Sequence, residues 1–140
     1  MPSCSTPRSA SSTTARSAPV RARKIAAFLS VPAAIDFQAR HDWPVWQRRC
    51  HDRALALQQR VLTRNGLQAI APASAYAQMV PIPVRCTDPE GLRRRHFEQH
   101  RIEVPVTQHG SGTFVRVSVQ AYNTQAELDS LDAALAAAGV

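Results

Sequence analysis

Lysine is almost missing from this 140-residue sequence: among its 17 basic residues, Lys24 is the only lysine and all others are arginine. Chemistry that requires a lysine inside a folded core therefore has no candidate residue. Aromatic residues make up only 6% of the chain, and alanine supplies much of its 44% hydrophobic share. We therefore expect one domain with a small core built from light side chains.

Cysteine is scarce and follows no recognisable pattern. Cys4, Cys50 and Cys86 are far apart and odd in number, and the chain contains no Cys-x-x-Cys. Such usage is typical of free thiols in a reducing compartment, so we expect a cytoplasmic protein. No apolar run approaches the ~20 residues of a transmembrane helix, and no apolar signal segment follows the N-terminal charges. We therefore expect no membrane partner.

Acidic residues are absent from residues 1–24, which hold five of the basic residues of the chain. This segment is rich in Ser, Thr, Ala, Pro and Arg and has no apolar periodicity, which predicts a disordered, low-complexity basic head. An Arg- and Ser-rich head is also typical of transit peptides, although amphipathic spacing is missing. Residues 25–140 contribute only +2 of the formal net charge of +7, so we expect no nucleic-acid partner.

Helical patterns begin at residues 25–40, where Pro32 predicts an interruption. Residues 41–66 carry the clearest pattern, with Asp42 as the expected cap and Asn65-Gly66 as the expected end. Apolar residues in this segment recur at steps of three and four and so share one face of a helix. These residues are Trp46, Cys50, Ala54, Leu57 and Val61.

Two further helices are predicted from their first residues. Asp88-Pro89 provides a cap and a first-turn proline for a helix that runs to about Gln99. Thr124 and Glu127 have the spacing of a capping box at the start of the last helix, which Gly139 closes. The apolar face of that helix consists of Leu128, Leu131, Leu135 and Ala138.

Strand patterns occupy residues 76–86, 101–106 and 113–120, and residues 107–112 are expected to form the turn of a hairpin between the last two. Pro81 and Pro83 predict that the first strand lies at a sheet edge. The sequence therefore predicts an α+β fold. We expect a small, mostly antiparallel three-stranded sheet with helices packed on one face, preceded by a long helix and the disordered head.

Several motifs suggest chemistry but favour simpler interpretations. His96 and His100 are four apart on a predicted helix and could hold zinc, but their order relative to Glu98 is not that of a metalloprotease, so exposed histidines and no metal site are expected. Cys50 and His51 are adjacent on a helix and do not face each other, so Cys50 is expected in the core. Residues 91–101 form a charged helix face, and residues 109–112 a plain turn.

Arg116 is the candidate site residue. It interrupts the most strand-like run of the chain and shares one face with Phe114 and Ser118, whereas three valines occupy the other face. The valine face suits contact with helices, so Arg116 is expected on the opposite face, which a partner domain or another chain could cover. Its side chain is either an exposed strand residue or an anion-binding group.

The chain resembles a known family over roughly residues 26–135. The segments "AAFLSVPAAIDF", "HRIEVPV" and "FVRVSVQAYNTQAELDSLDAAL" are similar to the C-terminal region of class V aminotransferase-like enzymes, especially the isopenicillin N epimerase-like branch. These are fold type I enzymes that depend on pyridoxal phosphate. The most specific run is Arg116, Ser118, Tyr122 and Asn123, and the resemblance implies that Arg116 binds the α-carboxylate of an amino-acid substrate.

The resemblance also implies what this sequence does not supply. The family holds pyridoxal phosphate on a lysine upstream of the matching region, and Lys24 has none of the expected sequence around it. We therefore expect residues 25–140 to be the C-terminal small domain of such an enzyme, without a cofactor or catalytic residue of its own and inactive alone. A truncated gene or a mispredicted start would produce this. The alternative is an interaction module or split-enzyme subunit that pairs with a separate large domain, and a homodimer also remains open.

Overall fold

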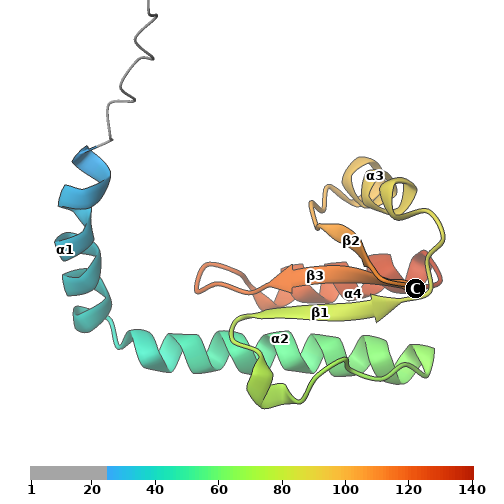
Figure 1. The fold of residues 1–140 in the computed structure, drawn as a ribbon, viewed down its shortest axis with the longest axis horizontal. Helices are drawn as coiled ribbons and strands as arrows, with labels where there is room; N and C mark the ends of the chain where they lie inside the picture. The colour runs from blue at the N-terminus through green and yellow to red at the C-terminus, as the bar shows by residue number, and fades with distance from the viewer. Residues whose placement is uncertain (1–24) are drawn as a thin grey trace, which may run out of the picture. The chain divides into compact units, whose positions relative to one another are not determined.

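A computed structural model describes residues 25–140 of the chain. The helices are α1 (Ile25–Arg40), α2 (Trp43–Asn65), α3 (Pro89–His100) and α4 (Gln125–Ala137), and the strands are β1 (Met79–Val84), β2 (Val106–His109) and β3 (Gly112–Ser118) (Figure 1). The predicted disordered head, residues 1–24, lies outside the described residues. The chain divides into two units, Met1–Asp36 and Phe37–Val140, and the second contains the sheet.

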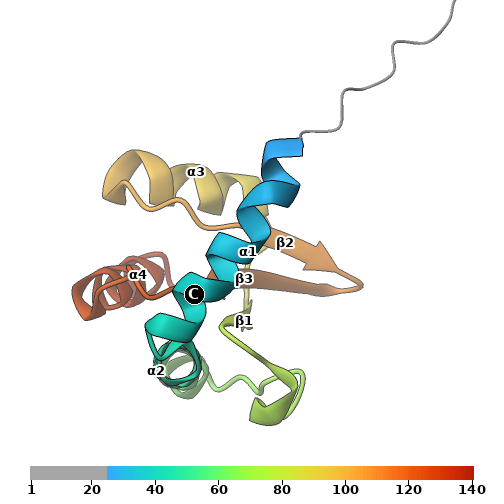
Figure 2. The ribbon, with the colours of Figure 1, turned by 90° about the vertical axis from the view of Figure 1, so that its left-hand side faces the viewer.

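The three strands form one antiparallel sheet in the order β1-β3-β2. Val80 and Ile82 of β1 lie opposite Val117 and Val115 of β3, and all four side chains are buried. Within residues 37–140, the helices lie on this valine side of the sheet (Figure 2). The structure thus confirms the predicted α+β fold with helices on one face.

The core is built from the predicted helix faces. Four of the five residues in the predicted stripe of α2 are buried, namely Cys50, Ala54, Leu57 and Val61. Leu128, Leu131 and Leu135 of α4 pack into the same cluster. Three ion pairs also join these helices: Arg64 Nη1 lies 2.6 Å from Asp132 Oδ1, Arg60 Nη1 lies 3.0 Å from Asp129 Oδ1, and Arg60 Nε lies 3.4 Å from Asp132 Oδ2.

Strand β1 lies at a sheet edge, as its prolines predict. Val119 donates its backbone N–H to Gln78 O at 2.9 Å, which puts the even-numbered residues of β1 in hydrogen-bonding register with β3. Pro81 and Pro83 therefore turn their backbone atoms to the open edge, where their missing N–H groups cost no ladder bond. Gln58 of α2 covers part of this edge by donating from Nε2 to Pro81 O at 2.8 Å.

The second strand differs from the prediction. It was expected at residues 101–106, but β2 occupies Val106–His109 and includes much of the expected turn. The hairpin itself is confirmed, with His109 paired to Gly112 and only Gly110 and Ser111 between them. Gly110 has a φ of +57°, which glycine adopts without strain and which lets the strands continue to the turn.

Two details of the helix predictions are wrong, and two are confirmed. Helix α1 continues through Pro32, and Asp42 precedes α2 in a left-handed conformation without a side-chain cap. The missing proline N–H costs α1 one bond, which an exposed helix can replace with water. In contrast, Asp88 Oδ1 accepts from Gly91 N, and Thr124 and Glu127 form the full capping box.

Candidate functional site

Arg116 lies in the middle of β3 on the sheet face opposite the core. Its neighbours on that face are Phe114 and Ser118 of the same strand, and Pro81 lies opposite it on β1. Its backbone N–H donates to Pro105 O at 2.9 Å, which fixes the start of β2 beside it. The structure confirms the predicted separation of faces, because Val115, Val117 and Val119 are all buried whereas Arg116 is exposed.

The guanidinium of Arg116 has no hydrogen bond or ion pair with any residue in the range 25–140. Some other arginines of the domain do make hydrogen bonds within it, to backbone carbonyl oxygens. Arg53 donates to Asn123 O at 3.2 Å, and Arg85 donates to Asn65 O at 2.8 Å. A guanidinium offers five donors in a planar fork, so the fork of Arg116 is available to an external acceptor.

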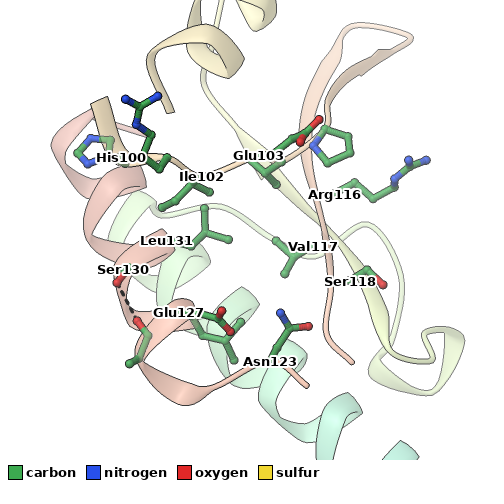
Figure 3. Close-up of a pocket in the computed structure, with 15 residues that line it drawn as sticks. His100, Ile102, Glu103, Arg116, Val117, Ser118, Asn123, Glu127, Ser130 and Leu131 are labelled. Carbon is green, nitrogen blue, oxygen red and sulfur yellow. Dashed lines mark hydrogen bonds between the residues drawn. The ribbon is translucent and has the colours of Figure 1, made fainter. Parts of the chain in front are cut away.

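A pocket of about 560 Å³ adjoins this strand, between α4 and the segment after α3. Its labelled lining residues include Glu103, Glu127, Asn123 and Leu131 (Figure 3). Figure 3 shows the side chain of Arg116 directed away from Leu131 and Glu127, on the other side of β3. The lining also includes Arg101 and Arg116, so the two carboxylates of the pocket are accompanied by two guanidiniums.

The carboxylate of Glu127 serves the start of α4. It accepts the backbone N–H of Thr124 at 2.7 Å, and this bond, with a further one from the Asn123 side chain, lowers the pKa of Glu127 below its ordinary value of 4.5. Asn123 also accepts from Gln120 N at 2.8 Å through Oδ1. Both residues therefore hold the turn between β3 and α4 in shape.

The four residues that carry the family resemblance thus lie in different surroundings. Arg116 and Ser118 stand exposed on one sheet face, Tyr122 is 80% exposed, and Asn123 is part of the turn. The structure brings Arg116 and Ser118 together but does not join Tyr122 to them by any described contact.

Two curated proteins are similar to this chain over most of its length. An isopenicillin N epimerase of Amycolatopsis lactamdurans is 34% identical over 116 residues, which are 81% of this chain and 29% of the relative. An isopenicillin N epimerase of Streptomyces clavuligerus is 30% identical with the same coverage. No protein-family model matches the chain.

These matches support an epimerase-like relationship. The chain spans less than one third of the length of the curated relatives it matches, since the aligned part is 29% of each. Within residues 25–140, no helix is long and apolar enough to cross a membrane.

The other candidate residues of the sequence have mixed outcomes. Cys50 is buried and has no hydrogen bond to His51, whose Nε2 lies 3.4 Å from Ala73 O, so the expected core role of Cys50 is confirmed. His100 is exposed as expected. The same expectation is wrong for His96, which is only 1% exposed. His96 follows Leu92 by four residues, and this spacing puts both on the buried side of α3.

Proposed function

We propose that residues 25–140 form the C-terminal small domain of a pyridoxal-phosphate-dependent enzyme of the class V aminotransferase family, of the isopenicillin N epimerase-like branch. The substrate would be an amino acid, bound through its α-carboxylate. The observation that carries the proposal is the 34% identity over 116 residues to an isopenicillin N epimerase. Free thiols at Cys50 and Cys86 support a reducing compartment such as the cytoplasm.

The described residues do not fit a complete cofactor site. Pyridoxal phosphate is held in its enzymes as a Schiff base on a lysine, and residues 25–140 contain none. The single lysine of the sequence, Lys24, lies outside the described residues. We therefore propose that this domain contributes substrate binding, while residues outside 25–140 hold the cofactor.

Arg116 is the proposed substrate-binding residue. Its exposed, unpartnered guanidinium can donate two parallel hydrogen bonds to one carboxylate, which fixes both the position and the orientation of that group. Pro81 and Phe114 flank it in the sheet and add apolar surface around the charge. An amine without a carboxylate would gain nothing from this arrangement.

Helix α1 supports the proposal that further protein covers this domain in the enzyme. Six of its large apolar side chains are at least half exposed, among them Phe28 at 68% and Leu29 at 73%. A cluster of this kind is typical of a surface that contacts protein. The partner would be a large domain, in the same chain or in another, and the second copy of a homodimer is the other candidate.

A chimera tests the proposed function. The region of the Amycolatopsis lactamdurans relative that matches this chain is replaced by residues 25–140, and exchange of the substrate Cα proton with deuterium oxide is followed by nuclear magnetic resonance. We expect exchange that Arg116→Ala slows while cofactor binding is retained. Arg94→Ala is the matched control, because Arg94 is exposed on α3. A cofactor-loaded chimera with equal exchange in wild type and Arg116→Ala would show that Arg116 is an ordinary surface residue.

The alternative proposal is an interaction module or split-enzyme subunit that pairs with a separate large-domain protein. The exposed apolar side chains of α1 favour it equally. Sequencing the DNA upstream separates the two. A neighbouring reading frame that encodes a lysine-bearing large domain supports a split enzyme, whereas a single continuous frame supports one longer chain.

A further inference from the structure

His96 is a buried polar residue that the fold does not fully satisfy. Its side chain is 1% exposed, and its Nδ1 lies 2.8 Å from the carbonyl oxygen of Leu92 one turn earlier in α3. Since a carbonyl oxygen can only accept, Nδ1 carries the proton in this contact. In the neutral ring, Nε2 therefore presents a lone pair, and it has no hydrogen-bond partner among the described residues.

This arrangement is the one that metal-binding histidines use. A ligating imidazole commonly donates its second ring N–H to a backbone carbonyl or carboxylate, which fixes the tautomer and aims the other nitrogen at the ion. A buried acceptor without a partner is otherwise unfavourable, because it loses water and gains nothing in return. The lone pair of His96 Nε2 is therefore free to accept a hydrogen bond or to bind a metal ion.

His100 supplies a second imidazole one helical turn further along α3. The two ring centroids are 6.2 Å apart. The side chain of His100 is exposed and makes no hydrogen bond with residues 25–140, so a change of rotamer can bring its nitrogen closer to His96. Two histidines at positions i and i+4 of a helix lie on the same face and can share one ion.

A cavity of about 90 Å³ lies at this pair, lined by α3 and α4. On the α4 side its walls are Ala134, Ala137 and Ala138, whose short side chains leave the space open. A bound water takes up about 30 Å³, so there is room for an ion with one or two waters. The residues that line it are Arg95, His96, Gln99, His100 and these three alanines.

We propose that His96 and His100 form a two-histidine site for a divalent transition-metal ion such as Zn²⁺, Ni²⁺ or Cu²⁺, completed by water. Neutral imidazoles favour these ions over Mg²⁺ and Ca²⁺, which prefer oxygen ligands. Within residues 25–140, no group of three or more His, Cys, Asp or Glu side chains could hold a metal, so the site has two protein ligands. Arg95 adds a positive charge at the cavity, so the affinity is modest.

The test titrates the full chain with ZnCl₂ and follows the ring nitrogens of its five histidines by two-bond ¹H–¹⁵N nuclear magnetic resonance, with calorimetry for the affinity. We expect one ion per chain and shifts at His96 and His100, while His41, His51 and His109 stay unchanged. Outer-shell changes lower metal affinity about tenfold to a hundredfold, so His100→Gln, which removes a ligand, should do at least as much.

Three further variants make the result decisive. His109→Gln, an exposed histidine on β2, is the matched control and should bind Zn²⁺ as wild type does. Cys86→Ser should also bind normally, whereas Arg95→Gln should bind more tightly. Because His96→Gln can disturb the core, the conclusion depends on His100→Gln. Equal Zn²⁺ affinity in wild type and His100→Gln, binding that Cys86→Ser abolishes, or unshifted nitrogens of His96 would each overturn the site.

Discussion

Pro81 of β1 and Arg116 of β3 lie opposite each other in the sheet, on the face that no helix of residues 37–140 covers. A proline ring is rigid and apolar, so the Arg116 side chain lies beside an apolar neighbour, and it makes no hydrogen bond or ion pair with residues 25–140. Arg116 is therefore expected to contribute little to the stability of the fold. Its substitution should mainly affect the binding of an amino acid.

Arg116→Ala in the isolated chain should therefore leave the free energy of unfolding within about 0.5 kcal/mol of wild type, as is usual for surface changes. In the chimeric enzyme the same substitution should weaken binding of an amino acid by roughly 1.5–3 kcal/mol for each charge-assisted hydrogen bond lost. Arg116→Lys should recover only part of the affinity, because an ammonium cannot form the paired contact. Denaturant melts and substrate titrations measure the two effects. Loss of stability without loss of affinity would contradict the assignment.

Helix α1 should make the isolated chain bind apolar dyes. Phe28 and Leu29 are 68% and 73% exposed, and replacing both by serine should reduce the fluorescence of a bound naphthalene sulfonate dye and lower self-association in sedimentation experiments. Tyr122→Ser is the control, because Tyr122 is 80% exposed but lies away from this cluster in the sequence. A monodisperse wild-type chain without dye binding would rule out the exposed apolar surface.

The capping box of α4 should contribute measurably to stability. Thr124 Oγ1 accepts the backbone N–H of Glu127 at 3.3 Å, and Thr124→Ala should lower the free energy of unfolding by about 0.5–2 kcal/mol. Thr87→Ala is a suitable control, since Thr87 is exposed and makes no side-chain hydrogen bond within residues 25–140. Equal midpoints for the two variants in urea would show that the cap is dispensable.

Low pH should reduce the stability that the N-terminal turn of α4 contributes. The backbone N–H of Thr124 holds the pKa of Glu127 below its ordinary 4.5, and bonds from Gln125 and then Arg60 hold the pKa of Asp129 below its ordinary 3.8. Both groups bind protons more tightly in the unfolded chain. Their contribution is therefore complete above those ordinary values and is lost as pH falls through the lowered ones.

Unfolding midpoints in urea between about pH 6 and about pH 3 measure this loss. Glu127→Gln keeps an acceptor for the Thr124 N–H but cannot titrate, so its stability should fall less steeply with acid. Glu98→Gln is the control, because Glu98 is exposed and makes no ion pair in the described part of the chain. An identical slope for Glu127→Gln and wild type would contradict the assignment.

Local signals predicted the parts of the fold that depend on local interactions. The capping box at Thr124 and the stop at Gly66 involve residues within a few positions of each other, and both formed as expected. The position of β2 could not be predicted this way, because Val106–His109 is a strand only through its pairing with β3. An apolar pattern at residues 101–106 was a weaker guide than the partner strand.

The candidate residues also divide into those whose placement local patterns predict and those whose placement depends on distant parts of the chain. Alternation along β3 predicted the face on which Arg116 lies, because strand geometry fixes it. His96 shares a cavity with alanines of α4, which comes from a distant part of the sequence. The spacing from Leu92 to His96 was a signal for the burial of His96, but α3 has so few apolar residues that its buried side was difficult to recognise.

The two prolines of β1 also determine how copies of this domain can associate. A strand edge with free N–H groups can recruit the edge of another molecule and extend the sheet from one chain into the next. Pro81 and Pro83 present no N–H there, and the carbonyl of Pro81 is already bonded to Gln58. Growth of a fibril by strand addition is therefore blocked along β1. Association through the apolar side chains of α1 should instead give amorphous, detergent-reversible clusters.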